Sequence, residues 1–267
     1  MKSILFSLFF ALSLLATAQT KETVILISTN MGDMKAILYN DTPKHRDHYL
    51  KLIKQGYFDG TLFSRVVKGY VIQGGSKDSR GAAPGVKVGY GNSSMELFPE
   101  FRKSYFHKKG ALCAPRQPNN VNPQRKSDAS QFFIVQGTVL TAGQLDTMEM
   151  AKNVPIKNKA YSQIYTPIKD ELTALKESNP KLYNEKVRLI KTQLDSALMA
   201  SPNKLIFTPA QREAYTTIGG APNLDGDYTV FGELIEGLDV IDKIAALKVN
   251  GFDRPFTDVK MKVSIVE

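Results

Sequence analysis

The chain has 267 residues, of which 42% are hydrophobic and 23% are charged, and its formal net charge is +9. This composition is typical of a globular protein with enough chain for one large domain or two small ones. The basic residues are interspersed with acidic ones, which argues against a protein that binds nucleic acid, and the single cysteine, Cys113, excludes an internal disulfide.

The first 18 residues have the composition of a secretory signal peptide. Lys2 precedes an apolar run over residues 4–15, and Ala-Thr-Ala at 16–18 is a small-x-small cleavage site. A membrane anchor is the alternative, but an apolar run of about a dozen residues is too short to cross roughly 30 Å of hydrocarbon. We therefore expect a mature domain of residues 19–267 that is exported, periplasmic or secreted, with no membrane span after cleavage.

The first half of the mature chain alternates between strand patterns and turn signals. Period-two apolar alternation indicates strands, proline after a capping residue indicates the start of a helix, and glycine-rich stretches indicate loops. The elements predicted in this way are strands over Val24–Ser28 and Met34–Tyr39, a helix from Thr42-Pro43 to about Gln55, a hairpin over Phe63–Gly75, a glycine-rich loop over Gly81–Asn92, a short buried strand over Ala111–Ala114, a polar loop over Asn119–Ser127 and a strand over Ser130–Val135.

The hairpin Phe63–Gly75 carries polar residues that a sheet alone does not require. Its sequence, FSRVVKGYVIQGG, alternates along the first strand and turns at Lys68-Gly69 before a second apolar run. Such a hairpin can place an arginine, an aromatic, an aliphatic and a glutamine side chain on one face of a sheet. Long polar side chains on a half-buried surface need partners, so Arg65 and Gln73 are candidate functional residues. The alternative is an arginine on a solvated face and a glutamine that ends an edge strand.

Helix signals replace strand signals between about Leu140 and Ala221. Thr-Pro at 166–167, Asn-Pro at 179–180 and Thr-Pro at 208–209 each precede a stretch with apolar residues at helical spacing. These stretches are too short for a coiled coil. Beyond them we expect a turn over Asn223–Gly226, a strand over Tyr228–Leu234, a helix over Gly237–Ala246 and a final strand over Lys260–Val266. The simplest interpretation is a β-rich body interrupted by one helical insertion.

The residues that commonly carry covalent, metal or acid–base catalysis are not arranged for it. Cys113 lies in an apolar run, where a buried and inert thiol is expected. The three histidines show no metal-ligand spacing, and His45 and His48 lie beside basic residues on what we expect to be a solvated helix face. The chain has no glycine-rich phosphate loop, nucleophile elbow or paired-carboxylate motif. We expect no metal and no cofactor.

Three motifs fit the pattern of one family. They are F-S-R-V-V-x-G-Y-V-I-Q-G-G at residues 63–75, S-Q-F-F-I at 130–134 and L-D-G-x-Y-T-V-F-G at 224–232. In this order they closely resemble the cyclophilin-type peptidyl-prolyl cis-trans isomerases, over about residues 24–137 and 223–266. The resemblance implies a mainly β fold, a closed eight-stranded antiparallel β-barrel capped by two helices. The substrate groove would lie outside, because such a barrel fills its interior with side chains.

The activity that the resemblance implies needs neither a nucleophile nor a metal. Rotation about an X–Pro bond breaks no covalent bond, and amide resonance sets its barrier at about 18–20 kcal/mol. A catalyst must bind the twisted amide better than either planar isomer. The twisted nitrogen has a localised lone pair that can accept a hydrogen bond, and the resemblance assigns the donor to the always-charged Arg65.

The resemblance also implies a set of substrate-binding residues, five around an apolar socket for the proline ring and three polar. The socket residues are Tyr70, Val71, Phe133 and Leu224, with Tyr228 at the rim. The polar residues are Gln73, which would hold the peptide backbone, Gln131, which would support the side of the socket where Arg65 lies, and Arg116, which takes the place of an asparagine that grips the backbone. For Phe133 and Leu224 the alternative is an ordinary core position.

Several positions depart from the pattern of the family. Many members carry histidine where this chain has Ser64, phenylalanine where it has Tyr70 and methionine where it has Val71. An aromatic residue, often tryptophan, is replaced by Asn223. Arg116 replaces the backbone-gripping asparagine, and the adjacent Pro115 lacks an N–H group that a peptide could use. These departures leave the catalytic efficiency open.

The sequence supports three functional hypotheses. The first is an exported isomerase that acts on proline-containing unfolded or flexible polypeptides. The second is a peptide-binding chaperone on a cyclophilin scaffold with weak or no catalysis, and the third is an adaptor whose helical insertion recruits a partner. The insertion, at about residues 140–221, begins and ends beside the predicted pocket. It could therefore form an extra wall that contacts clients, or pack elsewhere as a structural cap.

Overall fold

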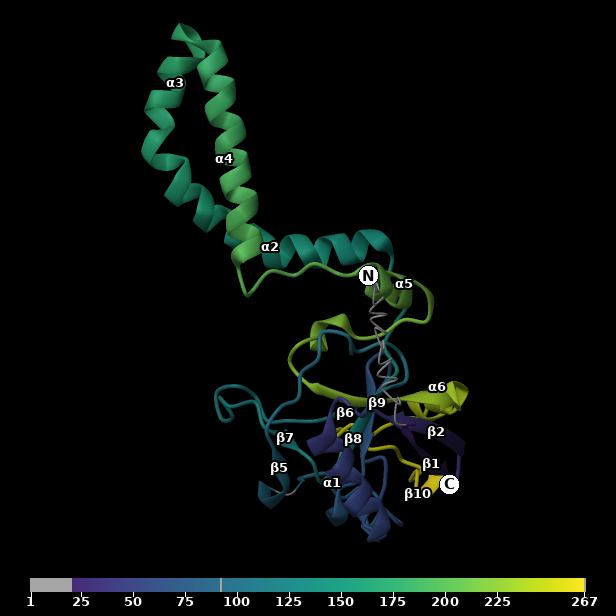
Figure 1. Cartoon of the computed structure of the whole chain (residues 1–267). Helices are drawn as coiled ribbons and strands as arrows, with labels where there is room; N and C mark the ends of the chain where they lie inside the picture. Colours follow the sequence, from purple (N-terminus) through teal and green to yellow (C-terminus); the bar gives the residue numbers. More distant parts are fainter. Residues whose placement is uncertain (1–20, 92, 267) are drawn as a thin grey trace, which may run out of the picture.

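The computed structural model describes residues 21–91 and 93–266, and the predicted signal peptide lies outside them. Its main element is a curled sheet of eight antiparallel strands (Figure 1). In sheet order the strands are β10 (Met261–Val266), β1 (Thr23–Thr29), β2 (Gly32–Leu38), β9 (Thr229–Glu236), β6 (Ala111–Ala114), β8 (Phe132–Val135), β4 (Val71–Gly74) and β3 (Arg65–Val67). A second sheet pairs β5 (Glu96–Leu97) with β7 (Ser127–Asp128). Two helices, α1 (Pro43–Lys54) and α6 (Leu238–Ala245), pack against the large sheet.

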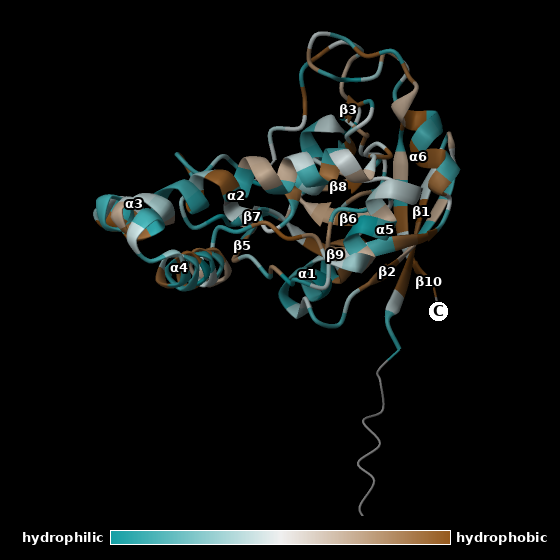
Figure 2. Cartoon of the chain, turned by 90° about the horizontal axis from the view of Figure 1, so that it is seen from above, coloured by the Kyte–Doolittle hydropathy of each residue, from teal (hydrophilic) through white to brown (hydrophobic). Residues whose placement is uncertain are grey.

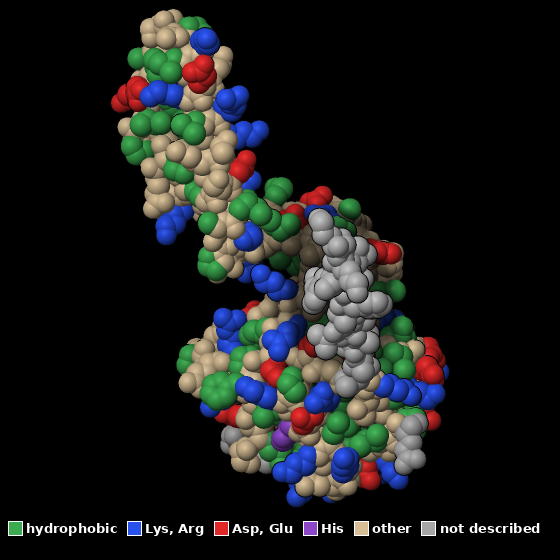
Figure 3. Space-filling model, viewed as in Figure 1, with side chains coloured by type: hydrophobic (Ala, Val, Ile, Leu, Met, Phe, Trp, Pro, Cys, Tyr) green, Lys and Arg blue, Asp and Glu red, His purple; other side chains and the backbone are tan. Residues whose placement is uncertain are grey.

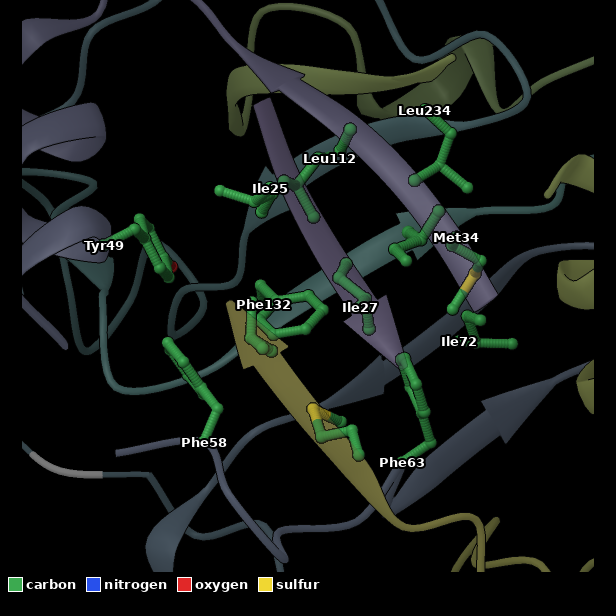
Figure 4. Packing of buried hydrophobic residues seen from close by; sticks show 14 of the residues in the cluster. Ile25, Ile27, Met34, Tyr49, Phe58, Phe63, Ile72, Leu112, Phe132 and Leu234 are labelled. Atoms are coloured by element: carbon green, nitrogen blue, oxygen red, sulfur yellow. The ribbon is translucent and has the colours of Figure 1, made fainter. Parts of the chain in front are cut away.

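The concave side of the large sheet is filled by side chains. Successive residues of a strand point to opposite faces, so Ile25 and Ile27 of β1 enter the interior while their neighbours do not. They meet aromatic side chains from other segments, including Tyr49 of α1 and Phe132 of β8 (Figure 4). Tyr49 also donates a hydrogen bond from its hydroxyl to Gln131 O at 2.7 Å. A packed interior leaves the outer face of the sheet as the surface where a ligand can bind.

The edges of the curled sheet do not meet along a continuous ladder. Near β3 and β10 they are joined by an isolated antiparallel bridge between Leu62 and Lys260. Past this bridge Val66 N donates to Asp253 O at 2.8 Å, so a loop rather than a strand lies beside β3. The prediction of eight antiparallel strands is confirmed, whereas the closed barrel is not, because the loop containing Asp253 interrupts pairing between the two edges.

The start of α1 corrects the prediction of a solvated histidine face. His45 is completely buried, with Nδ1 at 2.7 Å from Glu100 Oε2 and Nε2 at 3.0 Å from Ser127 Oγ. A carboxylate only accepts hydrogen bonds, so Nδ1 carries the proton and Nε2 accepts from the serine hydroxyl. Glu100 also accepts from the backbone N–H groups of Lys44 and His45. The carboxylate therefore caps the helix, a role that sequence analysis had assigned to Thr42, whose side chain makes no capping bond.

Acidification is expected to lower the free energy of unfolding through this pair. Burial lowers the pKa of His45 below 6.5 and outweighs the opposite effect of Glu100. Burial alone would raise the pKa of Glu100, but hydrogen bonds from His45 and from backbone N–H groups lower it below 4.5 overall. The unfolded chain therefore binds protons at both groups at a higher pH than the folded chain. Stability is lost as the pH falls below about 6.5, and further below about 4.5.

Urea unfolding at pH 7.5 and 5.5 measures this effect, with His45→Gln as the diagnostic variant. The variant should lose much of the difference between the two pH values. Burial also lowers the pKa of His48, which should account for part of the remaining difference. An unchanged pH dependence in His45→Gln would contradict the assignment.

The chain between β8 and β9 is helical. It contains α2 (Ala142–Ile164), the 3-10 helix η3 (Thr166–Ile168), α3 (Lys169–Ser178), α4 (Pro180–Ala200) and α5 (Pro209–Thr217). Helices α3 and α4 form a hairpin that stands away from the strands (Figures 1 and 2). None of the helices in the described part of the chain is long and apolar enough to cross a membrane.

The helical segment is attached to the body at its two ends. Leu145, Phe207 and Tyr215 form a small buried cluster with Phe106 packed against it. Further out, the Asn153 side chain pairs with the backbone of Leu205, donating to its O at 2.7 Å and accepting from its N at 2.9 Å. These bonds hold the segment that leaves the body next to the segment that returns to it. We call residues 155–204, which lie beyond this pair, the arm.

Candidate active site

The outer face of the sheet carries a row of side chains from four neighbouring strands. Arg65 on β3 pairs with Gln73 on β4, Gln73 pairs with Phe133 on β8, and Phe133 pairs with Cys113 on β6. Directly paired residues project from the same face, and the neighbouring Ile72 belongs to the interior cluster instead. The strand register therefore aligns a guanidinium, an amide and an aromatic ring on one surface.

A cavity of about 200 Å³ lies over this row. All nine residues that sequence analysis assigned to the site line it, although they come from separate segments of the chain. These residues are Arg65, Tyr70, Val71, Gln73, Arg116, Gln131, Phe133, Leu224 and Tyr228. The remaining lining residues are Gly89, Tyr90, Pro115, Gln117 and Asp128.

One end of the cavity is apolar. Val71, Phe133 and Leu224 are each at most 5% exposed and belong to one cluster. The Tyr228 ring meets the Phe133 ring edge-on, with centroids 5.6 Å apart. Leu224 ends the 3-10 helix η4 (Pro222–Leu224), so the wall that it forms follows directly after the helical segment. Phe133 and Leu224 are thus both buried and part of the cavity lining.

The other end of the cavity is polar and open to solvent. The Arg65 side chain is 43% exposed, and its Nε lies 3.3 Å from Asp253 Oδ2. Asp253 has a φ of 62°, a left-handed conformation that is uncommon for a residue other than glycine. Beside Arg65, Gln73 Nε2 donates to Gln131 Oε1 at 3.0 Å. The guanidinium is thus held by Nε, while its terminal nitrogens make no hydrogen bond that involves the described residues.

Arg116 lines the cavity but is bound within the protein. Its Nε donates to Asp227 O at 2.5 Å, its Nη1 donates to Asn119 Oδ1 at 2.7 Å, and its Cζ lies 4.9 Å from the centroid of the Tyr228 ring. Burial raises the pKa of Tyr228, and the nearby Arg116 has the opposite effect. The guanidinium therefore braces the rim of the socket, and a direct grip on a peptide backbone remains a prediction.

A carboxylate behind the apolar end ties the helical segment to the cavity wall. Asp225, which follows Leu224, accepts hydrogen bonds from His107 N and Nδ1, both at 2.9 Å, through Oδ1. Its Oδ2 accepts from Tyr215 Oη at 2.7 Å and from Gln211 Nε2 at 3.1 Å, both on α5. His107 and Tyr215 are completely or almost completely buried. The position of Leu224 therefore depends on α5.

Sequence analysis missed four residues around the site: Tyr90, His107, Asp128 and Asp253. Tyr90 lies in the predicted glycine-rich loop, where only its aromatic character in a polar stretch marks it. Asp128 stands two positions before the Ser-Gln-Phe-Phe motif, and this proximity is the one usable signal for it. His107 and Asp253 reach the site through contacts more than 100 residues away along the chain, which no local pattern indicates.

Cys113 is buried, as expected, and burial raises the pKa of its thiol. It lies beneath the cavity and is not part of the lining. Within residues 21–91 and 93–266, no group of three or more His, Cys, Asp or Glu side chains is placed to hold a metal ion.

Comparison with known proteins agrees with this geometry. Residues 24–154 and 210–265 match the sequence model of the family described as "Cyclophilin type peptidyl-prolyl cis-trans isomerase/CLD". The chain is 29% identical over 250 residues to a Staphylococcus epidermidis protein named "Putative peptidyl-prolyl cis-trans isomerase", covering 93% of this chain and 94% of that protein. It is also 29% identical to a Streptococcus pyogenes "Putative bifunctional phosphatase/peptidyl-prolyl cis-trans isomerase", of which it spans 37%.

A solved structure from Cryptosporidium parvum shares the fold. This cyclophilin-type peptidyl-prolyl cis-trans isomerase superposes with a TM-score of 0.53 at 17% identity, covering 92% of this chain and 99% of that one. The family match leaves out residues 155–209, which contain the arm. The matched residues make up more than half of the chain and include the strands of the large sheet. The chain therefore belongs to the cyclophilin-type peptidyl-prolyl cis-trans isomerases.

Proposed function

We propose that this protein accelerates cis-trans rotation of Xaa-Pro bonds in flexible polypeptides by stabilising the twisted amide, without a covalent intermediate. The observation that carries the proposal is the single cavity in which the Arg65 guanidinium lies beside an apolar socket. The described lining contains no Cys, Ser, His or Lys side chain, and its carboxylate, Asp128, accepts hydrogen bonds from Ser130 and Gln131. Bond rotation needs none of these groups.

The apolar end is proposed to bind the proline ring. Val71, Phe133 and Leu224 are already buried, so a ring that enters is desolvated against a preformed wall. Burial of its three methylene groups contributes about 2 kcal/mol. This contribution is the same for the cis, trans and twisted forms, because the ring itself does not change. The socket therefore tightens binding without lowering the barrier.

The polar end is proposed to lower the barrier. As the amide twists, its nitrogen becomes pyramidal and its lone pair localises, so the nitrogen can accept a hydrogen bond that the planar amide cannot. Arg65 is always charged and is held at Nε by Asp253, which leaves its terminal nitrogens to donate. An interaction made only in the transition state raises kcat. Gln73 and Gln131, next to the guanidinium, are proposed to hold the flanking backbone and to support Arg65.

A protease-coupled assay on a chromogenic Xaa-Pro peptide tests the proposal, because the protease cleaves only the trans isomer. The cis-to-trans rate should rise in proportion to the concentration of the wild-type protein. No acceleration by folded protein at micromolar concentration would overturn it.

The substrates are proposed to be exported proteins. The basis is the apolar run, flanked by Lys2, that precedes the small-x-small site at residues 16–18. The mass of the exported protein tests this proposal. It should correspond to a chain that starts at Gln19, and a chain that retains Met1 would contradict it.

A peptide-binding chaperone is the second candidate function, and the surface of the arm favours it. Exposed apolar side chains along the arm include Tyr161, Leu189 and Met199. Its sequence has nine Lys and Arg against five Asp and Glu, a net charge of +4. Figure 3 shows these basic side chains interspersed with the hydrophobic ones. Such a surface suits extended segments of unfolded chains.

Removal of the arm separates the two functions. Replacing residues 157–202 with a short Gly-Ser linker keeps Asn153 paired with Leu205 and retains α5 with Tyr215. The variant is expected to keep its activity on the Xaa-Pro peptide and to suppress aggregation of an unfolded protein less well. Leu189→Ser in the full chain, a milder change at an exposed position, should weaken suppression in the same direction. Unchanged suppression in both variants would contradict a client-binding role of the arm.

A further inference from the structure

A line of side-chain hydrogen bonds leads along the cavity to Arg65. Asp128 Oδ2 accepts from Gln131 Nε2 at 2.9 Å, and Gln131 Oε1 accepts from Gln73 Nε2 at 3.0 Å. Gln73 is the strand partner of Arg65, so these two side chains leave the sheet side by side. All four residues line the cavity.

The line has a direction, and Asp128 is the nearer of the two acceptors that set it; the other is Gly89 O, 3.5 Å from Gln131 Nε2. A glutamine amide presents either its oxygen or its NH₂ group in nearly the same volume, so two glutamines in series can point either way. A carboxylate has only acceptors. Gln131 must therefore turn its NH₂ group to Asp128 and its oxygen to Gln73, which in turn must donate to Gln131. This leaves the Gln73 oxygen as the unused acceptor of the line, on the strand that pairs with Arg65.

Asp128 is itself fixed. Its Oδ1 accepts from Ser130 N at 3.0 Å and from Ser130 Oγ at 2.5 Å. Gly91 lies so close that an added Cβ would be 1.8 Å from Asp128 Oδ2, so only glycine leaves room for the carboxylate there. Gln131, the next group along, is 4% exposed. Water therefore competes little for these bonds.

We infer that Asp128 is a positioning residue that keeps the Gln73 amide oxygen toward the Arg65 guanidinium. The inference rests on the proposed function, because it concerns how Arg65 is aimed at the substrate amide. With the opposite direction, the positive end of the Gln73 amide would face the guanidinium and displace it. In a partly buried site, water screens the repulsion between the amide NH₂ group and the guanidinium only weakly.

Asp128→Asn reverses the line. The Ser130 N–H group is a fixed donor, so the asparagine oxygen turns to Ser130 and its NH₂ group turns to Gln131. Gln131 then donates to Gln73, and Gln73 presents its NH₂ group to Arg65. We expect kcat to fall about tenfold, because the guanidinium is displaced from the substrate amide. KM should change less than kcat, because the apolar socket is untouched.

A compensating substitution restores the direction. In the double variant Asp128→Asn with Gln131→Glu, the asparagine NH₂ group donates to the glutamate, whose second oxygen accepts from Gln73. Gln131→Glu alone places two carboxylates face to face and should also lower kcat. The double variant should recover most of the wild-type kcat, whereas a merely structural role makes it at least as slow as either single variant.

Asp239→Asn, on the exposed face of α6, is the matched control and should behave as the wild type. Circular dichroism and thermal unfolding establish that each variant is folded. If the wild-type protein shows no activity, the proposed function and this inference both fail. With an active wild type, Asp128→Asn at the wild-type kcat, or a double variant no faster than the single variants, overturns the inference alone.

Discussion

Arg65→Ala is expected to lower kcat/KM for an Xaa-Pro peptide about 100- to 1,000-fold, the usual cost of losing one hydrogen-bond donor that stabilises a transition state. The loss should lie in kcat, because the socket proposed to bind the proline ring remains. Arg65→Lys should recover only part of the activity. Lysine is a point charge without the Nε through which Asp253 holds the side chain. The protease-coupled assay measures both variants.

Arg80→Ala is the control for Arg65→Ala. Arg80 is an exposed arginine that donates to the backbone oxygens of Gly56 and Tyr57, away from the cavity. The Arg80→Ala variant should keep the wild-type kcat. Because Arg65 is 43% exposed, its loss should hardly change the urea midpoint. A folded Arg65→Ala protein with wild-type kcat/KM would refute the role of the guanidinium.

Asp225→Ala is expected to cause the largest loss of stability, about 3–5 kcal/mol, the usual cost of leaving buried charged or polar partners unpaired. It removes the acceptor for His107 and Tyr215, which are buried, and for Gln211. Burial, followed by the charge of Asp225, raises the pKa of Tyr215, so its hydroxyl remains a neutral donor that needs an acceptor. Urea unfolding measures the change in the free energy of unfolding.

Asp239→Ala removes a carboxylate on the exposed face of α6 and should hardly change the free energy of unfolding. The comparison separates the buried network from the general effect of removing an aspartate. Asp225→Ala should also raise KM, because Leu224 loses its connection to α5. A loss of stability no larger than that of Asp239→Ala would show that the network contributes little.

The strands and the main residues of the site were predictable because they depend on local periodicity and on contiguous motifs. Alternation along Phe63–Gly75 placed Arg65 and Gln73 on one face, and the structure pairs them directly. The strand predicted over Ala111–Ala114 has the same bounds in the structure. Three Ser/Thr/Asn-Pro signals indicated helices, and Asn179 and Thr208 do accept capping bonds at the starts of α4 and α5.

What failed depends on contacts between distant segments. His45 was expected in solvent because its helix neighbours are basic, but Glu100 and Ser127 bury it. Helix α2 was not separately predicted. Its apolar residues are spread around the helix, and its capping box at Thr141 and Gln144 contains no proline. Asp225 was assigned only to a turn, because the partners that give it a structural role lie on α5 and at His107.

The polar surroundings of Arg65 were equally hidden from local patterns. Asp253 reaches it from a loop almost 190 positions later in the chain, and nothing in that loop marks the residue. The prediction of a closed barrel was not confirmed for the same reason, since this loop takes the place of strand pairing beside β3. The sequence therefore predicted which residues line the cavity better than it predicted what holds them in place.

Exchange NMR on an Xaa-Pro peptide with separate cis and trans signals distinguishes binding from barrier lowering within one sample. With wild-type protein, cross-peaks between the two isomers should appear at mixing times of a fraction of a second, against tens to hundreds of seconds for the free peptide. With Arg65→Ala the peptide should bind with the same Kd, but the cross-peaks should vanish. Equal exchange rates for the two proteins at equal occupancy would contradict stabilisation of the twisted amide by Arg65.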